Sequence, residues 1–189
     1  MNKLFYIIGA SGAGKDTLIN YARTKINGSD PVIFAHRYIT RPPHAGNENH
    51  VCLSNEEFQL RIKANLFAMY WEGHGNFYGL GREINSWLEN GFNVVVNGSR
   101  QYLPVAKQIY PDMKVILIEA SQETINQRLS SRGREDTGAI EKRIARTSEI
   151  SSDLENCIKL QNNGTVEDAG NELVNIICLR HTGDLIKES

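Results

Sequence analysis

The sequence predicts an α/β fold in which helices cover both faces of a mostly parallel sheet. Strand-like apolar runs alternate with helix-like segments along the chain, and this alternation is typical of parallel strands joined by helices. The run Phe92–Val96 is β-branched and nearly continuous, as expected of a strand that is buried on both faces. A glycine-rich loop joins the first apolar run, Leu4–Ile8, directly to a helix-like segment. The chain has 189 residues, so these elements fit one domain, residues 1–189.

Apolar spacing and local capping signals place the individual elements. Ser54 and Thr165 each open a capping-box pattern, so a helix should begin at each of them. The expected strands are Leu4–Ile8, Val32–Tyr38, Leu66–Trp71, Phe92–Val96, Met113–Glu119 and Cys157–Gln161. The expected helices are Thr17–Lys25, Ser54–Lys63, Arg82–Asn90, Gln101–Tyr110, Ser121–Arg132, Ala139–Leu154 and Thr165–Arg180. The polar segment His44–Leu53 and the glycine-rich segment Gly73–Gly79 are expected to be loops.

The composition excludes several classes of protein. A net charge of −1 argues against a general nucleic-acid surface, which needs a basic excess. Cys52, Cys157 and Cys178 are scattered and odd in number, and the histidines form no metal-spaced set, so we expect neither a disulfide framework nor a zinc site. No apolar run reaches the ~20 residues of a membrane span, and the first strand leaves no room for a signal peptide. We expect a soluble cytoplasmic protein that contacts neither nucleic acid nor membrane, and its oligomeric state, including a homodimer, stays open.

The loop after Leu4–Ile8 has the context of a phosphate-binding P-loop, which lies between a strand and a helix. Its glycines let backbone N–H groups curl around an anion without a Cβ in the way. The following helix directs unpaired N–H groups and its positive dipole end at the same anion. Lys15 adds a mobile charge that can follow the terminal phosphates of a nucleotide during transfer. The residues expected to bind the nucleotide here are Gly9, Ala10, Ser11, Gly12, Ala13, Gly14, Lys15, Asp16 and Thr17.

The residue after Lys15 departs from the usual pattern. A hydroxyl residue normally follows the lysine and binds Mg²⁺, whereas here Asp16 follows it and Thr17 comes one place later. Three interpretations stay open: Asp16 binds the metal as a hard oxygen ligand, Thr17 binds it, or Asp16 only caps the helix. Many P-loop enzymes hold the metal with an acid at a second strand end, where this chain has Asn97. Asp16 would then supply the carboxylate that this strand lacks.

A second set of phosphate ligands is expected in the region of residues 32–92. Arg37 and Arg41 lie close together in the sequence, and Tyr78 lies in a short segment flanked by glycines. Arginine and phenol groups commonly hold a phosphate that is not transferred. The alternative is a pair of solvated arginines with a core tyrosine, but the P-loop in the same chain favours binding.

Arginines gather again in two helical segments separated by Gly133 and Gly138. They are Arg128, Arg132, Arg134, Arg143 and Arg146. Such a cluster is typical of a lid that brings positive charge onto a transferring phosphoryl group and excludes water. The alternative is a solvated helical hairpin whose acids pair with the arginines. We expect a lid at residues 128–147, in which Arg132, Arg134 and Arg143 act with Lys15 in catalysis and Arg128 contacts the nucleotide.

These motifs resemble the guanylate kinase family over nearly the full chain, and within it the ribose 1,5-bisphosphate phosphokinases are more similar. The stretches that carry this closer resemblance are Gly14-Lys15-Asp16-Thr17, Ala35-His36-Arg37-Tyr38-Ile39-Thr40-Arg41, Glu48-Asn49-His50 and Val96-Asn97-Gly98-Ser99-Arg100. Aspartate after the P-loop lysine is usual in that branch. The resemblance implies a three-layer P-loop kinase fold that uses ATP and Mg²⁺, with Asn162 near the adenine.

The chain departs from guanylate kinases where they recognise the base. Those enzymes read guanine with an acid and a hydroxyl, and the aligned positions here are Met69 and Leu80. Methionine and leucine cannot accept a strong hydrogen bond from a base edge. His44 and His50 replace an arginine and a tyrosine of the nucleotide phosphate grip. GMP should therefore be a poor substrate, and a sugar phosphate should fit better.

The resemblance implies transfer of a phosphoryl group from ATP to ribose 1,5-bisphosphate, giving 5-phosphoribosyl 1-diphosphate. The acceptor oxygen belongs to a phosphate that is already anionic near neutral pH, so no strong general base is needed. The expected acceptor ligands are Arg37, Arg41, His50, Tyr78, Asn97 and Arg100. Two alternatives stay open: a kinase acting on GMP or another nucleoside monophosphate, and a non-catalytic module that binds phosphopeptides. The intact P-loop with Lys15 argues against the module.

Overall fold

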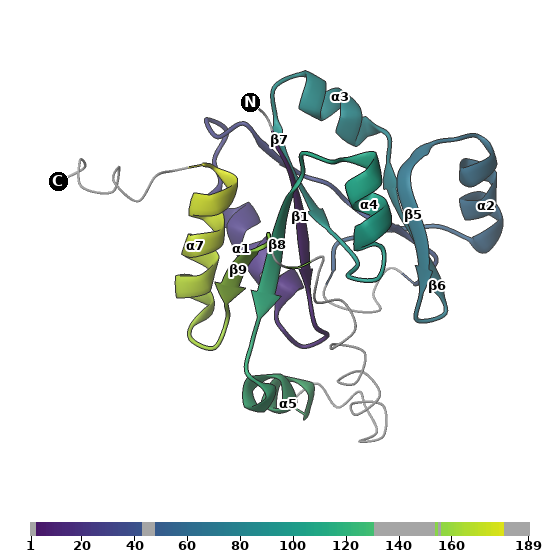
Figure 1. Ribbon diagram of the computed structural model, residues 1–189. Helices are drawn as coiled ribbons and strands as arrows, with labels where there is room; N and C mark the ends of the chain where they lie inside the picture. Colours follow the sequence, from purple (N-terminus) through teal and green to yellow (C-terminus); the bar gives the residue numbers. More distant parts are fainter. Residues whose placement is uncertain (1–2, 43–47, 131–153, 155, 180–189) are drawn as a thin grey trace.

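The computed structural model describes residues 3–42, 48–130, 154 and 156–179, which form two sheets and their covering helices (Figure 1). The larger sheet has five strands in the order β2-β7-β1-β8-β9, and every neighbouring pair is parallel. Its strands are β1 Leu4–Gly9, β2 Val32–Phe34, β7 Asn93–Asn97, β8 Lys114–Glu119 and β9 Ile158–Gln161. The predicted α/β fold with a mostly parallel sheet is confirmed.

Helices cover both faces of the larger sheet, which gives three layers (Figure 1). On one face, α1 (Lys15–Lys25) and α7 (Val166–Ile177) pack on each other and on Phe5 and Ile7 of β1. On the other face, α3 (Glu83–Glu89) and α4 (Leu103–Ile109) pack around Tyr6 and its neighbours. Successive β1 side chains point to opposite faces, so a strand between two helical layers must be apolar throughout.

A second sheet, which the sequence analysis does not predict, holds the region expected to bind the acceptor. Its four strands run in the order β4-β3-β6-β5, with β3 Tyr38–Ile39, β4 Val51–Cys52, β5 Phe67–Gly73 and β6 Asn76–Gly81. The β3–β4 pair is parallel and the other pairs are antiparallel. Helix α2 (Asn55–Lys63) covers it through Phe58, which stacks on Phe67 and Phe77. Two of these strands span two residues each, too short to leave a periodic signal in the sequence.

Three predicted elements are wrong. The expected loop His44–Leu53 contains the short strand β4, Val51–Cys52, which pairs with β3. The single strand Val32–Tyr38 is divided, because the chain leaves the larger sheet after Ala35 and pairs with the second sheet from Tyr38 onward. The expected loop Gly73–Gly79 is instead a hairpin. His74 and Gly75 turn the chain with φ of 52° and 70°, as in a tight two-residue turn. Gly79 is therefore not a turn residue: a Cβ there would lie 2.5 Å from the Phe67 ring.

The capping signals place two helices correctly. The Ser54 side chain accepts a hydrogen bond from the Glu57 N–H, and Thr165 accepts one from Asp168, so α2 and α7 begin where predicted. Helix α5 (Gln122–Ser130) likewise follows Ser121, whose hydroxyl accepts from the Thr124 N–H. Helices α3 and α4 are one or two residues shorter than predicted at each end, whereas α1 begins two residues earlier than predicted, since apolar spacing does not fix helix ends. The predicted helix Ala139–Leu154 lies almost entirely outside the described residues. None of the helices in the described ranges is both long and apolar enough to cross a membrane.

Parallel strands direct their carboxyl ends to the same edge of a sheet, where ligands of such folds bind. At this edge β1 ends at Gly9, β7 ends at Asn97 and β9 is followed by Asn162. The second sheet begins after Ala35, close to the same edge, because Ala35 N–H donates to Val95 O of β7. The fold therefore brings the predicted nucleotide and acceptor residues together.

Candidate active site

The predicted P-loop connects β1 to α1, and its shape requires glycine at two places. Gly12 and Gly14 have φ of 83° and 94°, a left-handed backbone that other residues rarely adopt. Gly14 is the N-cap of α1, so the helix starts at Lys15. The free N–H groups of the first helical turn face the loop, which suits an anion. The structure also excludes the reading in which Asp16 only caps the helix, because Asp16 lies inside the first turn.

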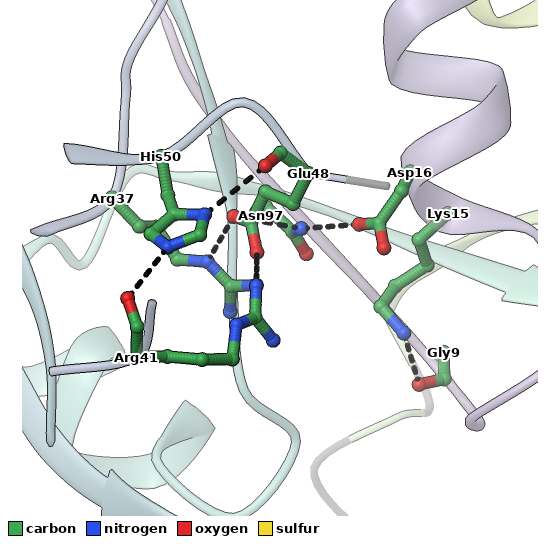
Figure 2. A network of polar contacts seen from close by, with 8 residues as sticks. All are labelled: Gly9, Lys15, Asp16, Arg37, Arg41, Glu48, His50 and Asn97. Atoms are coloured by element: carbon green, nitrogen blue, oxygen red, sulfur yellow. Dashed lines mark hydrogen bonds and ion pairs between the residues drawn. The ribbon is translucent and has the colours of Figure 1, made fainter. Parts of the chain in front are cut away.

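Lys15 is folded back onto its own loop. Its Nζ donates to the carbonyl oxygens of Gly9 at 2.9 Å and Ala10 at 3.3 Å (Figure 2). The pKa of Lys15 is lowered to about 8, mainly by burial of the ammonium group; the charges of Arg37 and Arg100 also lower it, whereas those of Asp16 and Glu48 raise it. Both guanidinium groups therefore lie within electrostatic reach of the lysine. Positive charge from three segments of the chain converges beside the P-loop.

The residue that follows β9 contacts the P-loop through a hydrogen bond. The side-chain amide of Asn162 donates to Ala13 O at 2.7 Å, and Arg128 donates to the same oxygen at 3.3 Å. Asn162 is only 1% exposed, so this hydrogen bond is shielded from water and helps to fix the P-loop. A contact of Asn162 with adenine stays a prediction. Arg128, which α5 supplies, reaches the loop as expected of a residue near the nucleotide.

Asp16 and Asn97, the two residues that depart from the usual P-loop pattern, are in contact. The Asn97 Nδ2 donates to Asp16 Oδ1 at 2.7 Å (Figure 2). Asn97 is at the end of β7 and Asp16 is in the first turn of α1, so the contact links the two elements. Thr17 is half-buried one residue further along the same helix. The proximity that our hypothesis requires is present, with the carboxylate on the helix and the amide on the strand.

Arg37 and Arg41 share one carboxylate, Glu48, which the sequence analysis did not select (Figure 2). The Nε and one terminal nitrogen of Arg37 donate to the two oxygens of Glu48 in a bidentate pair. Arg41 approaches the same carboxylate at 3.5 Å, and so does the Asn97 amide. The side chains of Arg37 and Glu48 are 12% and 11% exposed, so the pair lies largely away from solvent.

His50 contacts the backbone on both sides of its ring. Its Nδ1 contacts Glu48 O and its Nε2 contacts Arg41 O, each at 3.1 Å, and the ring is buried (Figure 2). Both ring nitrogens are thus taken by backbone carbonyls. In the described structure, His50 bridges the two ends of the segment that carries Arg41 and Glu48. Direct contact with a substrate stays a prediction, and the observed contacts describe a support.

Tyr78 belongs to β6 and is stacked in a column of side chains. Its ring packs parallel to Trp71 with centroids 5.8 Å apart, and Arg37 Cζ lies 5.0 Å from the Tyr78 ring centroid. A cation over an aromatic face is attracted by the ring. Tyr78 and Arg37, selected separately from the sequence, are therefore neighbours.

Arg100 is positioned by Tyr6, another residue that sequence reasoning missed. The Tyr6 hydroxyl donates to Ser99 O and accepts from Ser99 N–H, and Gly98 packs so closely on the ring that a Cβ there would lie 2.3 Å away. Burial raises the pKa of Tyr6 to about 12, so the hydroxyl keeps its proton. An apolar run with a tyrosine in it gives no signal of this contact, since the partner lies far along the chain.

The positions that read the base in guanylate kinases are closed here. Met69 on β5 and Leu80 on β6 face each other across the hairpin and are 1% and 0% exposed. Both belong to the core cluster that also contains Ile84. Neither side chain is open to a ligand.

The catalytic arginines expected in the lid, Arg132, Arg134 and Arg143, lie outside the described residues, as do Arg146 and His44. Of the residues expected in the lid, Arg128 is described.

Comparisons with known proteins show which family the chain belongs to. A family model described as Guanylate kinase matches residues 1–179. The ribose 1,5-bisphosphate phosphokinase PhnN of Desulfomicrobium baculatum is 48% identical over 177 residues, covering 94% of this chain and 95% of that protein. The protein of the same name from Thiobacillus denitrificans is 46% identical over 175 residues, covering 93% of this chain and 92% of its own length.

Among solved structures, guanylate kinase from Anaplasma phagocytophilum matches with a TM-score of 0.70 at 15% identity, covering 96% of this chain and 87% of that one. At that identity the likeness concerns the fold alone. The branch follows from the relatives at 46–48% identity over nearly their whole length. The chain belongs to the guanylate kinase family and, within it, to the ribose 1,5-bisphosphate phosphokinases.

Proposed function

We propose that this protein transfers the γ-phosphoryl group of ATP to ribose 1,5-bisphosphate, giving ADP and 5-phosphoribosyl 1-diphosphate. One observation carries the proposal beyond family membership. The cationic groups for holding a phosphate, Arg37 and Arg41, are retained beside the P-loop, whereas the base-reading positions Met69 and Leu80 are apolar and buried. A site of this kind suits a phosphorylated acceptor that carries no nucleobase.

The loop of Gly9–Gly14 would hold the ATP phosphates. The close packing below it supports this role, because a Cβ on Gly14 would lie 2.3 Å from Asn162 and one on Gly9 would lie 2.6 Å from Ile118 O. Such packing fixes the loop in a shape whose N–H groups can converge on an anion. Lys15 would exchange its two loop carbonyls for the β- and γ-phosphates.

Asp16 and Thr17 would hold Mg²⁺. Both offer hard oxygen atoms in the first turn of α1, and Asn97 orients the Asp16 carboxylate with its amide. The donor set therefore fits the ion. When bound, Mg²⁺ neutralises negative charge on the ATP phosphates.

The transfer itself requires positioning and positive charge rather than a base. An oxygen of the acceptor's 1-phosphate attacks the γ-phosphorus, the bond from this phosphorus to the β–γ bridging oxygen breaks, and ADP leaves. The attacking oxygen is already ionised at neutral pH, so no group has to remove a proton. Lys15, Arg37 and Arg100 supply charge from the described structure. Arg132, Arg134 and Arg143 would add charge when the lid closes, as the sequence predicts.

The product identifies the reaction. ATP, Mg²⁺, ribose 1,5-bisphosphate and the enzyme should yield one ADP per acceptor consumed, with a new diphosphate signal at the sugar C1 in the ³¹P NMR spectrum. A reaction without acceptor measures hydrolysis of ATP. Release of inorganic phosphate instead of a C1 diphosphate would overturn the proposal, and no turnover with any acceptor would also favour the binding module.

A further inference from the structure

Glu48 puts a negative charge beside the arginines proposed to hold the acceptor phosphate. A carboxylate next to a site for a phosphate repels that phosphate, yet Glu48 lies between Arg37, Arg41 and Asn97. When the acceptor is bound, its phosphate can itself serve as the anionic partner of Arg37, so Arg37 does not need Glu48 in that state. The position of Glu48 therefore calls for a function of its own in the bound state.

The hydrogen-bonding capacity of the Glu48 carboxylate is only partly used. A carboxylate has about four lone-pair directions, and the bidentate pair with Arg37 fills two. The contacts with Arg41 and Asn97 are both 3.5 Å long, at the outer limit of a hydrogen bond. One direction on each oxygen thus stays available to a stronger donor.

Two neighbouring polar atoms also lack partners. Within the part of the chain that the structure describes, Arg41 Nε and Asn97 Oδ1 are buried and make no hydrogen bond. Buried polar atoms are nearly always paired, so each calls for a missing group. Arg41 Nε is a donor and fits a phosphate oxygen. Asn97 Oδ1 is an acceptor and fits a hydroxyl. A cavity of about 20 Å³ beside Asp16, Glu48 and Asn97 is large enough for one hydroxyl group.

Other occupants fit less well. A metal ion on Glu48 would lie next to the guanidinium groups of Arg37 and Arg41, which repel a cation. A base edge has no second reading group, since Met69 and Leu80 are buried and apolar. A neutral group that donates hydrogen bonds, on a molecule that also carries phosphate, satisfies every atom described.

We propose that Glu48 accepts hydrogen bonds from the vicinal hydroxyls of the acceptor's ribose and thereby sets the preference for a hydroxylated sugar phosphate. Arg37 fixes the carboxylate, and Asn97 offers a further acceptor beside it. This inference rests on the proposed function and adds the group that reads the sugar.

The test compares ribose 1,5-bisphosphate with its 2-deoxy and 3-deoxy analogues. A site built around a hydroxyl rejects an analogue without it, so the wild type should prefer the ribose compound over at least one analogue by about 100-fold or more in kcat/KM. In Glu48→Ala this preference should shrink to within about threefold, because the partner of the hydroxyl is gone. Glu48→Gln keeps one acceptor oxygen and should retain part of the preference.

Glu57→Gln is the matched control. Glu57 pairs with Arg61 on the surface of α2, so this change removes the same charge from another arginine pair away from the site. It should leave the preference as in the wild type. Thermal melting of each variant shows whether it is folded, and where Glu48→Ala fails to fold, Glu48→Gln and the wild-type preference decide.

Three results would overturn the inference. In the first, the wild type uses both deoxy analogues as well as ribose 1,5-bisphosphate. In the second, Glu48→Ala lowers activity with all three acceptors by the same factor, which would mean that Glu48 only positions the arginines. In the third, the wild type does not turn over ribose 1,5-bisphosphate, which would remove the proposed function itself. The first two leave that function intact.

Discussion

At the scale of single residues, the site brings several positive charges close together and offsets part of them with carboxylates. Arg37 and Arg100 both lie within electrostatic reach of Lys15, and burial of the lysine further disfavours its charge. Glu48 and Asp16 offset part of this charge. Without a ligand the positive groups of the site repel one another, and binding of phosphate groups reduces this repulsion.

The lowered pKa of Lys15 predicts a pH dependence. The ammonium is present below a pH of about 8 and is lost above it, since the pKa of the folded protein lies below the ordinary value of 10.5. The kcat/KM for ATP, which reports the free enzyme, should therefore fall as pH rises through about 8. Between this pH and the ordinary pKa the unfolded chain binds more protons, so Lys15 contributes a gain in stability as pH rises.

A pH profile of kcat/KM for ATP in wild type and Lys15→Arg checks this assignment. The guanidinium of the variant stays charged, so its profile should lack the fall near pH 8 even though its activity is lower. An identical fall in both proteins would assign it to another group.

His50 leads to a second prediction at this scale. The His50 ring lies 3.1 Å from the carbonyl oxygens of both Glu48 and Arg41, so it links the two ends of this segment. His50→Ala should raise the KM for the acceptor about tenfold, the equivalent of one or two hydrogen bonds, and leave the KM for ATP nearly unchanged. Steady-state kinetics with each substrate varied in turn measure both constants.

His74→Asn is the control for that variant. His74 lies in the turn between β5 and β6 of the same sheet with φ of 52°, a conformation that asparagine tolerates. It should change neither KM. An equal rise in both KM values for His50→Ala would contradict a role confined to the acceptor side.

At the scale of elements, the P-loop depends on a strand distant in sequence. Asn162, just beyond β9, donates to Ala13 O and leaves no room for a side chain at Gly14. Tyr6 of β1 likewise holds the loop after β7 through Ser99. Loops at a functional edge are kept rigid by such contacts, and rigidity lowers the entropy lost when a ligand binds.

Gly14→Ala should damage both the loop and the fold. The new Cβ would lie 2.3 Å from Asn162 Nδ2, at a residue with φ of 94°. We expect a loss of about 1–3 kcal/mol in the free energy of unfolding and at least a tenfold loss in ATP affinity, about 1.4 kcal/mol. Urea unfolding and calorimetric titration of ATP measure the two effects.

Gly28→Ala is the control for the loop variant, because a Cβ at Gly28 meets no atom within 4 Å. It should leave ATP affinity as in the wild type. Unchanged ATP affinity in Gly14→Ala would show that the loop does not hold the nucleotide.

The same elements show how far sequence alone reaches. Local signals succeeded: the capping residues Ser54 and Thr165 mark the helices they begin, and the P-loop pattern marks the connection from β1 to α1, although α1 begins two residues before the predicted Thr17. Signals that depend on distant partners failed. The second sheet was missed because β3 and β4 are short and β3 pairs with the distant β6, and Glu48 was missed because its partners Arg37, Arg41 and Asn97 come from two other stretches of the chain.

At the scale of the whole molecule, the two sheets divide the task. The larger parallel sheet ends in the P-loop, whereas the second sheet carries Tyr78 on β6, Arg41 just after β3, and the buried apolar pair Met69 and Leu80. The joint between them is the short passage from Ala35 to Tyr38, which includes Arg37. We therefore expect the acceptor preference to depend on the second sheet and on Glu48.

The ratio of kcat/KM for ribose 1,5-bisphosphate to kcat/KM for GMP, measured with ATP and Mg²⁺ in one ADP-release assay, tests this claim most directly. A site with buried Met69 and Leu80 cannot pair the guanine edge, so the ratio should be on the order of 10⁴ or more. A ratio near or below one would contradict the account, because it would mean that the enzyme recognises a purine by groups other than those described.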